Sequence, residues 1–210
     1  MQWIAMFTML IDHIGIVWFS DLSIWRILGR ISFPIYTFYV AQGMVLTRNR
    51  KKYVIRLAVL ALISQLPFSL LFDNSNINVI GTFLISVAAY YLMEHFKHTP
   101  LRFLFPVAAA VLLEQFHFDY GAYGLLLLFL YRYVSGTAMW VGHLSMNLLY
   151  WLMYSASLQM YSLIPTLAFA YAPKFQTRFS DLLHGYSTPR WLWRTFYPAH
   201  LVVLYMLTKI

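Results

Sequence analysis

The stretch WIAMFTMLIDHIGIVWF, residues 3–19, is apolar enough to cross a membrane, yet it carries Asp12 and His13 side by side near its middle. An ionisable residue inside a hydrocarbon span costs at least about 2.5 kcal/mol on insertion scales, and such residues usually serve a function and face the bundle interior. The sequence therefore predicts a membrane helix that carries a polar site.

Helical geometry separates the two ionisable side chains. Gln2 and His13 are eleven residues apart and share one face, whereas Asp12 falls in line with Thr8 and Gly15. Adjacent residues of a helix do not point at each other, so Asp12 is not expected to orient His13. We expect Asp12 to pair with a cation on a neighbouring helix and His13 to be available for proton transfer.

The composition is that of an integral membrane protein. Hydrophobic residues make up 61% of the 210 residues and charged residues 10%, against roughly 25% charged in an average soluble domain. The net charge of +8 comes from basic residues in short gaps between apolar blocks, so membrane topology explains it better than nucleic acid binding does. Because the chain has no cysteine, disulfides, thiolate metal sites and thiol catalysis are excluded.

The apolar stretches predict an all-α, polytopic membrane helical bundle with about nine transmembrane helices, forming a single domain over residues 1–210. The segment 173–195 is the longest predicted loop, and its Phe and Leu residues around Arg178 suggest a short interfacial helix. The first stretch lacks the features of a cleaved signal peptide and is interpreted as a retained span. The expected spans are Trp3–Phe19, Ile31–Leu46, Tyr53–Phe72, Val79–Met93, Leu101–Leu113, Tyr120–Val134, Ala138–Met153, Leu158–Ala172 and Phe196–Leu207.

The basic residues predict the orientation of these spans. The densest cluster, residues 48–52, lies between the second and third spans, and Lys and Arg favour the cytoplasmic side. This predicts a multi-pass protein of the cell membrane with its amino terminus in the cytoplasm. Of the basic residues, only Arg26, Arg30 and Lys209 then fall on the outer side.

Arg30 enters the second span from the outer side, and two partners are open to it. It can reach inward to Asp12, about 10 Å below the outer end of the first span, or stay at the interface and pair with Asp21. The same span continues with further polar residues, among them Gln42.

Polar motifs inside the apolar spans give the chain a resemblance to the TraX family that covers nearly its whole length. The matching residues are Ile4-Ala5 through Met9, Ile11-Asp12-His13-Ile14-Gly15, Gly29-Arg30-Ile31-Ser32-Phe33-Pro34-Ile35-Tyr36, Gln42-Gly43, Thr47-Arg48-Asn49, Arg56-Leu57, Ile63-Ser64-Gln65-Leu66-Pro67-Phe68, Asp119-Tyr120-Gly121, Tyr123-Gly124 and Phe196-Tyr197-Pro198-Ala199-His200-Leu201.

The TraX family is named for a conjugative pilin acetylase and is similar to the wider acyltransferase-three superfamily, whose multi-span enzymes use cytosolic acyl-CoA. The resemblance makes His13 the leading catalytic candidate, as a general base or as a transiently acetylated nucleophile. Asp12, Arg30 and Gln42 are the further candidates for the catalytic site. Two positions depart from the pattern: Gln2 stands where the superfamily has Arg, and Gln42 where the family often has Glu.

Acetyl-CoA, the co-substrate that the resemblance implies, needs cations for its phosphates on the cytosolic face. Lys52, Arg56 and Arg132 lie at that depth, and Arg56 is the leading candidate among them.

The remaining polar clusters are weaker candidates. His143 and Asn147 share a face and are interpreted as packing residues, and the role of His200 stays open. Glu114, His117 and Asp119 form the one plausible metal cluster, but no metal site is expected, because nothing supplies a second shell.

The resemblance implies an acetyltransferase that moves acetyl from acetyl-CoA to an amine or hydroxyl of a peptide, glycan or lipid-linked acceptor, by N- or O-acetylation. Two alternatives stay open. A proton-coupled transporter would also use Asp12 and His13, but it predicts inverted repeats, and none is visible. A non-catalytic membrane scaffold would use the polar residues only to pair helices.

Overall fold

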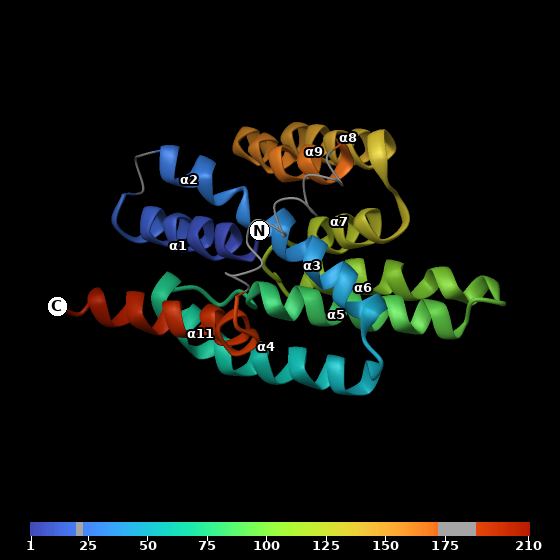
Figure 1. Cartoon of the computed structure of the whole chain (residues 1–210), viewed down its shortest axis with the longest axis horizontal. Coiled ribbons are helices and arrows are strands. Elements are labelled where there is room, and N and C mark those ends of the chain that lie inside the picture. The colour runs from blue at the N-terminus through green and yellow to red at the C-terminus, as the bar shows by residue number, and fades with distance from the viewer. Residues whose placement is uncertain (20–22, 172–187) are drawn as a thin grey trace. The chain divides into compact units, whose positions relative to one another are not determined.

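The computed structural model describes residues 1–19, 23–171 and 188–210 (Figure 1). Within these ranges the chain is all α-helical, apart from two short 3-10 helices, and contains no strand beyond an isolated parallel bridge between Ile77 and Phe118. The all-α prediction is therefore confirmed for the described part of the chain.

The helices form two compact units, and each is described by itself. Unit 1 comprises Met1–Phe38 and Tyr133–Phe196, and unit 2 comprises Tyr39–Arg132 and Tyr197–Ile210. Helices α3 (Ser32–Leu46) and α11 (Arg190–Leu207) contribute residues to both units. The prediction that residues 1–210 form a single domain stays a prediction.

Unit 1 is built from two helical pairs. Helix α1 (Gln2–Trp18) packs along α2 (Ser23–Gly29), and α8 (Gly136–Tyr154) packs along α9 (Leu163–Tyr171), as Figure 1 shows. The 3-10 helix η2 (Ser157–Ser162) contacts α8, α9 and α2, so it joins the two pairs. The Asp12 site is assembled at this junction.

Unit 2 centres on α5 (Val79–His95), which packs between α4 (Arg50–Phe72) and α6 (Leu104–Gln115) (Figure 1). The 3-10 helix η1 (Pro100–Phe103) precedes α6, and α7 (Gly121–Tyr133) follows it. A small apolar core joins α5, α6 and α7; its members are Ala89, Ala109, Leu113 and Leu125.

The connection between α4 and α5 is fixed by two amide side chains. Asn78 caps α5 by accepting a hydrogen bond from the Ile80 N–H at 3.1 Å, and its own amide donates to the Ala61 carbonyl and to Gln65 Oε1. Gln65 also accepts from the Asn78 N–H and donates to the Asn76 carbonyl. These bonds satisfy the polar groups where α5 begins and tie them to Ala61 and Gln65 inside α4, which explains polar residues inside an apolar stretch.

The predicted spans fall on helices, but their number as membrane crossings is not confirmed. Among the described residues, α4 is the one helix long and apolar enough to cross a membrane, with 23 residues; α1 and α5 are apolar but shorter, with 17 residues each. Only 22% of the apolar part of α4 is buried, and Leu62, Ile63 and Leu66 are exposed. An exposed apolar surface of this kind is typical of a helix that contacts lipid.

The observed helices differ from the predicted spans in three respects. Helix α2 was not predicted, because its seven residues are too few to show a clear period. The predicted span Leu158–Ala172 is divided between η2 and α9, and α11 begins at Arg190, inside the predicted loop 173–195. The interfacial helix expected around Arg178 lies outside the described residues.

Candidate functional site

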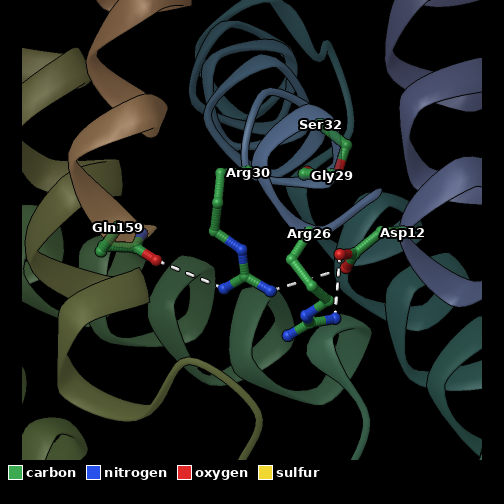
Figure 2. Close-up of polar contacts among 6 residues, drawn as sticks. All are labelled: Asp12, Arg26, Gly29, Arg30, Ser32 and Gln159. Carbon is green, nitrogen blue, oxygen red and sulfur yellow. Dashed lines mark hydrogen bonds and ion pairs between the residues drawn. The ribbon is translucent and has the colours of Figure 1, made fainter. Parts of the chain in front are cut away.

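The site in unit 1 is a carboxylate held between two guanidinium groups. Arg26 Nη1 lies 2.9 Å from Asp12 Oδ1, and Arg30 Nη2 lies 3.6 Å from Asp12 Oδ2 (Figure 2). The Asp12 side chain is 9% exposed, that of Arg30 15% and that of Arg26 27%. Asp12 therefore has the cationic partners that a buried carboxylate requires.

Two glycines allow α2 to approach α1 closely enough for these contacts. A Cβ atom added to Gly29 would lie 2.1 Å from Asp12 Oδ1, and one added to Gly15 would lie 2.3 Å from Trp25 Cβ. Side chains at either position would force the helices apart. The close approach brings Arg26 and Arg30, one helical turn apart, to the same carboxylate.

Arg30 also connects the ion pair to η2. Its Nη1 donates to Gln159 Oε1 at 3.3 Å (Figure 2). The Gln159 main chain is itself fixed, because its carbonyl accepts hydrogen bonds from Ser162 Oγ at 2.6 Å and from Asn147 Nδ2 at 3.0 Å. The ion pair thus continues into a buried polar network that reaches α8.

His143 lies at the far end of this network. It is fully buried, with Nδ1 at 2.6 Å from Thr166 Oγ1 and Nε2 at 3.2 Å from Ser162 Oγ. Both ring nitrogens are thus engaged by hydroxyls of η2 and α9, while the amide of Asn147 also donates to Ser162. These contacts support the packing role expected for His143 and Asn147.

The structure separates Asp12 from His13 as helical geometry predicts. Thr8, Asp12 and Gly15 lie on the buried stripe of α1, whereas His13 is half-buried. Arg30 reaches inward and pairs with Asp12, as one of the two alternatives for Arg30 predicted, and Arg26 pairs with Asp12 as well. Asp21, the other partner considered for Arg30, lies outside the described residues. The catalytic role of His13 stays a prediction.

Unit 2 contains a second cluster, in which arginines lie over tyrosine rings. Arg132 Nε donates to Tyr90 Oη at 3.0 Å, and its guanidinium lies 5.5 Å from the centre of that ring. The neighbouring Tyr91 lies beneath Arg50 at 5.2 Å, with the two tyrosine rings 5.5 Å apart.

The same cluster extends along the first turns of α4. The Arg56 guanidinium lies 5.7 Å from the ring centre of Tyr53. Two tyrosine hydroxyls of the cluster also donate hydrogen bonds to carbonyls of α3. The Tyr53 hydroxyl donates to the Val40 carbonyl, and the Tyr91 hydroxyl donates to the Met44 carbonyl. Residues of α4, α5 and α7 thus gather cations and aromatic faces at one end of the unit.

The other predicted site residues have simpler surroundings. Gln42 and Lys52 are exposed in unit 2, and Lys52 contributes a backbone N–H to the Asn49 cap of α4. His200 is buried, with its ring at 5.7 Å from that of Tyr197. Glu114 accepts a hydrogen bond from the Ala122 N–H at the start of α7, and no group of metal ligands is found among the described residues.

Sequence reasoning missed Arg26 and Gln159 as members of the site. Arg26 was assigned only to topology, although its spacing of four from Arg30 places both on one helical face. Gln159 carries no local signal, because it lies 129 residues from Arg30 and only the packing of η2 on α2 brings the two together.

These features define an all-α protein with a buried ion-pair site and a helix able to cross a membrane. The chain belongs to the TraX family, because the family model described as "TraX protein" matches residues 1–208. It is also 26% identical to a relative described as "Probable fimbrial assembly protein FimC, serogroup H1" from Dichelobacter nodosus, over 96% of this chain and 91% of that protein. No solved structure shows a significant match to the chain.

Proposed function

We propose that this protein is a membrane acetyltransferase that moves acetyl from acetyl-CoA to an amine or hydroxyl of a pilus or fimbrial component. Membership of the TraX family and similarity to a protein described as a fimbrial assembly protein support the pilus-related acceptor. The use of acetyl-CoA, the relation to the acyltransferase-three superfamily and the multi-pass topology with a cytoplasmic amino terminus are parts of this proposal.

The observation that carries the proposal is the arginine and tyrosine cluster of unit 2. Arg50, Arg56 and Arg132 each lie over a tyrosine ring at 5.2 to 5.7 Å. Guanidinium groups bind phosphate oxygens in pairs of charge-assisted hydrogen bonds. The half-buried Tyr53 and Tyr91 rings can stack on an adenine ring, whereas Tyr90 is buried. A coenzyme with phosphates and an adenine would use both kinds of group.

In the proposed reaction, the acceptor amine or hydroxyl attacks the thioester carbonyl carbon, and the carbon–sulfur bond breaks. His13 takes the proton from the acceptor, and the coenzyme leaves as a thiol after receiving a proton. The same residue could instead carry the acetyl group on its imidazole before the acceptor attacks. In both routes Asp12 stays bound to Arg26 and Arg30 and does not exchange protons with His13.

The proposal is tested by incubating the purified full chain with acetyl-labelled acetyl-CoA and a pilin-containing membrane extract. We expect release of free coenzyme A and labelling of an acceptor. His13→Ala should lower the rate by at least about 100-fold, the lower range for loss of a general base. His98→Ala, at an exposed turn, is the matched control and should retain the rate. Undiminished transfer by His13→Ala would remove His13 from the reaction, and absence of coenzyme release from the intact protein would refute the enzyme.

The cofactor assignment has its own prediction. Replacing Arg56 or Arg132 with Gln should raise the KM for acetyl-CoA about tenfold or more, because hydrogen bonds to charged groups contribute about 1.5–3 kcal/mol. The maximal rate should change little. Arg194→Gln, at an exposed position of α11, is the matched control. A KM for acetyl-CoA that does not differ between these variants and the control would place the coenzyme elsewhere.

A further inference from the structure

Four exposed basic residues stand together where α4 begins. Asn49 fixes the start of the helix, because its side chain accepts a hydrogen bond from the Lys52 N–H at 2.8 Å. The cations lie just before and within this first turn of α4 and together form its basic turn; they are Arg48, Arg50, Lys51 and Lys52. The fold thus presents four positive charges from one defined place on unit 2.

The charge of the basic turn is not balanced by carboxylates. No ion pair joins any of its four side chains to Asp or Glu within residues 1–19, 23–171 and 188–210. The Arg50 guanidinium lies over the neutral ring of Tyr91. Asp21 and Asp181, which lie outside the described residues, can balance two of the four cations at most. An excess of positive charge therefore stays at this surface.

An exposed apolar stripe follows the basic turn on the same face of α4. Because successive residues turn by about 100°, Lys51 and Lys52 lie near the two edges of this face, with apolar side chains in the arc between them. The opposite face is packed, with Ala61 and Phe68 buried. Each side chain of the stripe is between 46% and 76% exposed; the members are Ile55, Val59, Leu62, Leu66 and Leu70.

The stripe has the length of a lipid hydrocarbon layer. Lys51 and Leu70 are separated by about 28 Å along the helix axis, and the hydrocarbon core of a bilayer is about 30 Å thick. Beyond the stripe the chain becomes polar again, with Asp73 and Asn74 exposed. In a bilayer crossed by α4, the basic turn would therefore lie at the level of the lipid headgroups.

The connection between α5 and α6 adds the same two kinds of group at this end of unit 2. The contact between Arg50 and Tyr91, near the end of α5, places the connection close to the start of α4, and Figure 1 shows both at one end of the unit. Lys97 is exposed in this connection, and Leu101 and Phe103 are 58% and 56% exposed. Exposed cations and exposed apolar side chains thus occur together on two elements.

We propose that the basic turn and the apolar stripe of α4 bind an anionic phospholipid, with its phosphate among the basic side chains and its acyl chains along the stripe. A phospholipid joins a negative phosphate to apolar chains, in the order in which the two surfaces follow each other on α4. A soluble anion matches the cations alone, and a zwitterionic lipid lacks the net charge. The proposal does not depend on acetyl transfer, and Arg48 and Lys51 are not among the residues proposed to bind the coenzyme.

The test measures the melting temperature of the full chain in neutral detergent without acetyl-CoA, because a ligand that binds the folded state raises it. Three probes are titrated at equal ionic strength. They are phosphatidylglycerol, phosphatidylcholine with the same acyl chains, and glycerol phosphate, which carries the anion without the chains. We expect phosphatidylglycerol to stabilise the protein far more than the other two. Equal stabilisation by phosphatidylcholine or by glycerol phosphate overturns the proposal.

A double variant, Arg48→Gln with Lys51→Gln, locates the site. It should weaken the apparent affinity for phosphatidylglycerol at least about tenfold, since each basic residue near an anionic lipid surface contributes about fivefold. Arg194→Gln with Lys209→Gln removes the same charge at exposed positions on and just after α11 and should keep the affinity. An equal loss in both double variants overturns the proposal, because it would show a response to net charge alone.

A charge-conserving double variant, Arg48→Lys with Lys51→Arg, separates charge from structure. The phosphate of a lipid headgroup attracts either cation, so this variant should bind phosphatidylglycerol within about twofold of the unmodified protein. A loss as large as that of the Gln variant would show that the exchange perturbs the start of α4, and would overturn the assignment of the affinity to these two charges.

Discussion

Asp12 illustrates how much a single residue can specify. A carboxylate in the middle of an apolar stretch must have a cation, and the structure supplies two, at 2.9 and 3.6 Å. Because adjacent helical residues diverge, the same requirement leaves His13 on a different face. The local sequence thus assigns Asp12 to the ion pair. The catalytic role proposed for His13 is based only on the resemblance to the TraX family.

At the residue scale, we expect Asp12→Asn to destabilise the protein by about 3 kcal/mol, because two largely buried guanidiniums would lose their carboxylate. The measurement is the melting temperature of the purified protein in a neutral detergent. Asp73→Asn is the matched control, since Asp73 is exposed and its backbone φ of 47° suits Asn equally well. Equal melting temperatures for the two variants would show that the ion pairs contribute nothing to stability.

At the scale of elements, the connection between α4 and α5 shows why polar residues occur inside an apolar stretch. Gln65 forms hydrogen bonds with Asn78, the Asn76 carbonyl and Ser69, and Asn78 caps α5. The motif Ile63-Ser64-Gln65-Leu66-Pro67-Phe68, which carried part of the family resemblance, thus has a structural explanation. It fixes the geometry between two packed helices.

Gln65→Leu should therefore lower stability by about 2–3 kcal/mol, because the polar groups of the α4–α5 connection would lose their partners. Chemical or thermal unfolding followed by circular dichroism measures the change. Gln115→Leu, at an exposed position, makes the same substitution and should change stability by less than about 0.5 kcal/mol. If the two variants unfold alike, the connection does not depend on the Gln65 side chain.

At the scale of the whole molecule, α4 combines the length of a membrane span with an exposed apolar surface. Leu62 is 76% exposed and Leu66 68%, on a helix that is long enough to cross a membrane. Such a surface is unfavourable in water and favourable in a bilayer. The length, composition and exposure of α4 thus suggest membrane association through this helix.

Leu62→Arg places a charge near the middle of α4 and should reduce membrane integration, since Arg at the centre of a span costs about 2.5–3.5 kcal/mol. The measurement is the fraction of the segment 50–76 that inserts into microsomal membranes when it is placed between two glycosylation sites of a host protein, so that other crossings do not contribute. Asn74→Arg, in the exposed turn after α4, should leave that fraction unchanged. Equal insertion of the Leu62→Arg segment and the unmodified segment would show that Leu62 does not lie at the centre of a span.

The sequence by itself determined the class of fold, the positions of the long helices and the need of Asp12 for a cation, because hydrophobic periodicity and the cost of buried charge act over a few helical turns. It could not reveal Gln159, which meets Arg30 only through the packing of η2 against α2. It also could not show that Gly29 lies against Asp12, or that Arg132 lies over Tyr90. Such contacts join residues far apart in the chain, so only the tertiary structure decides them.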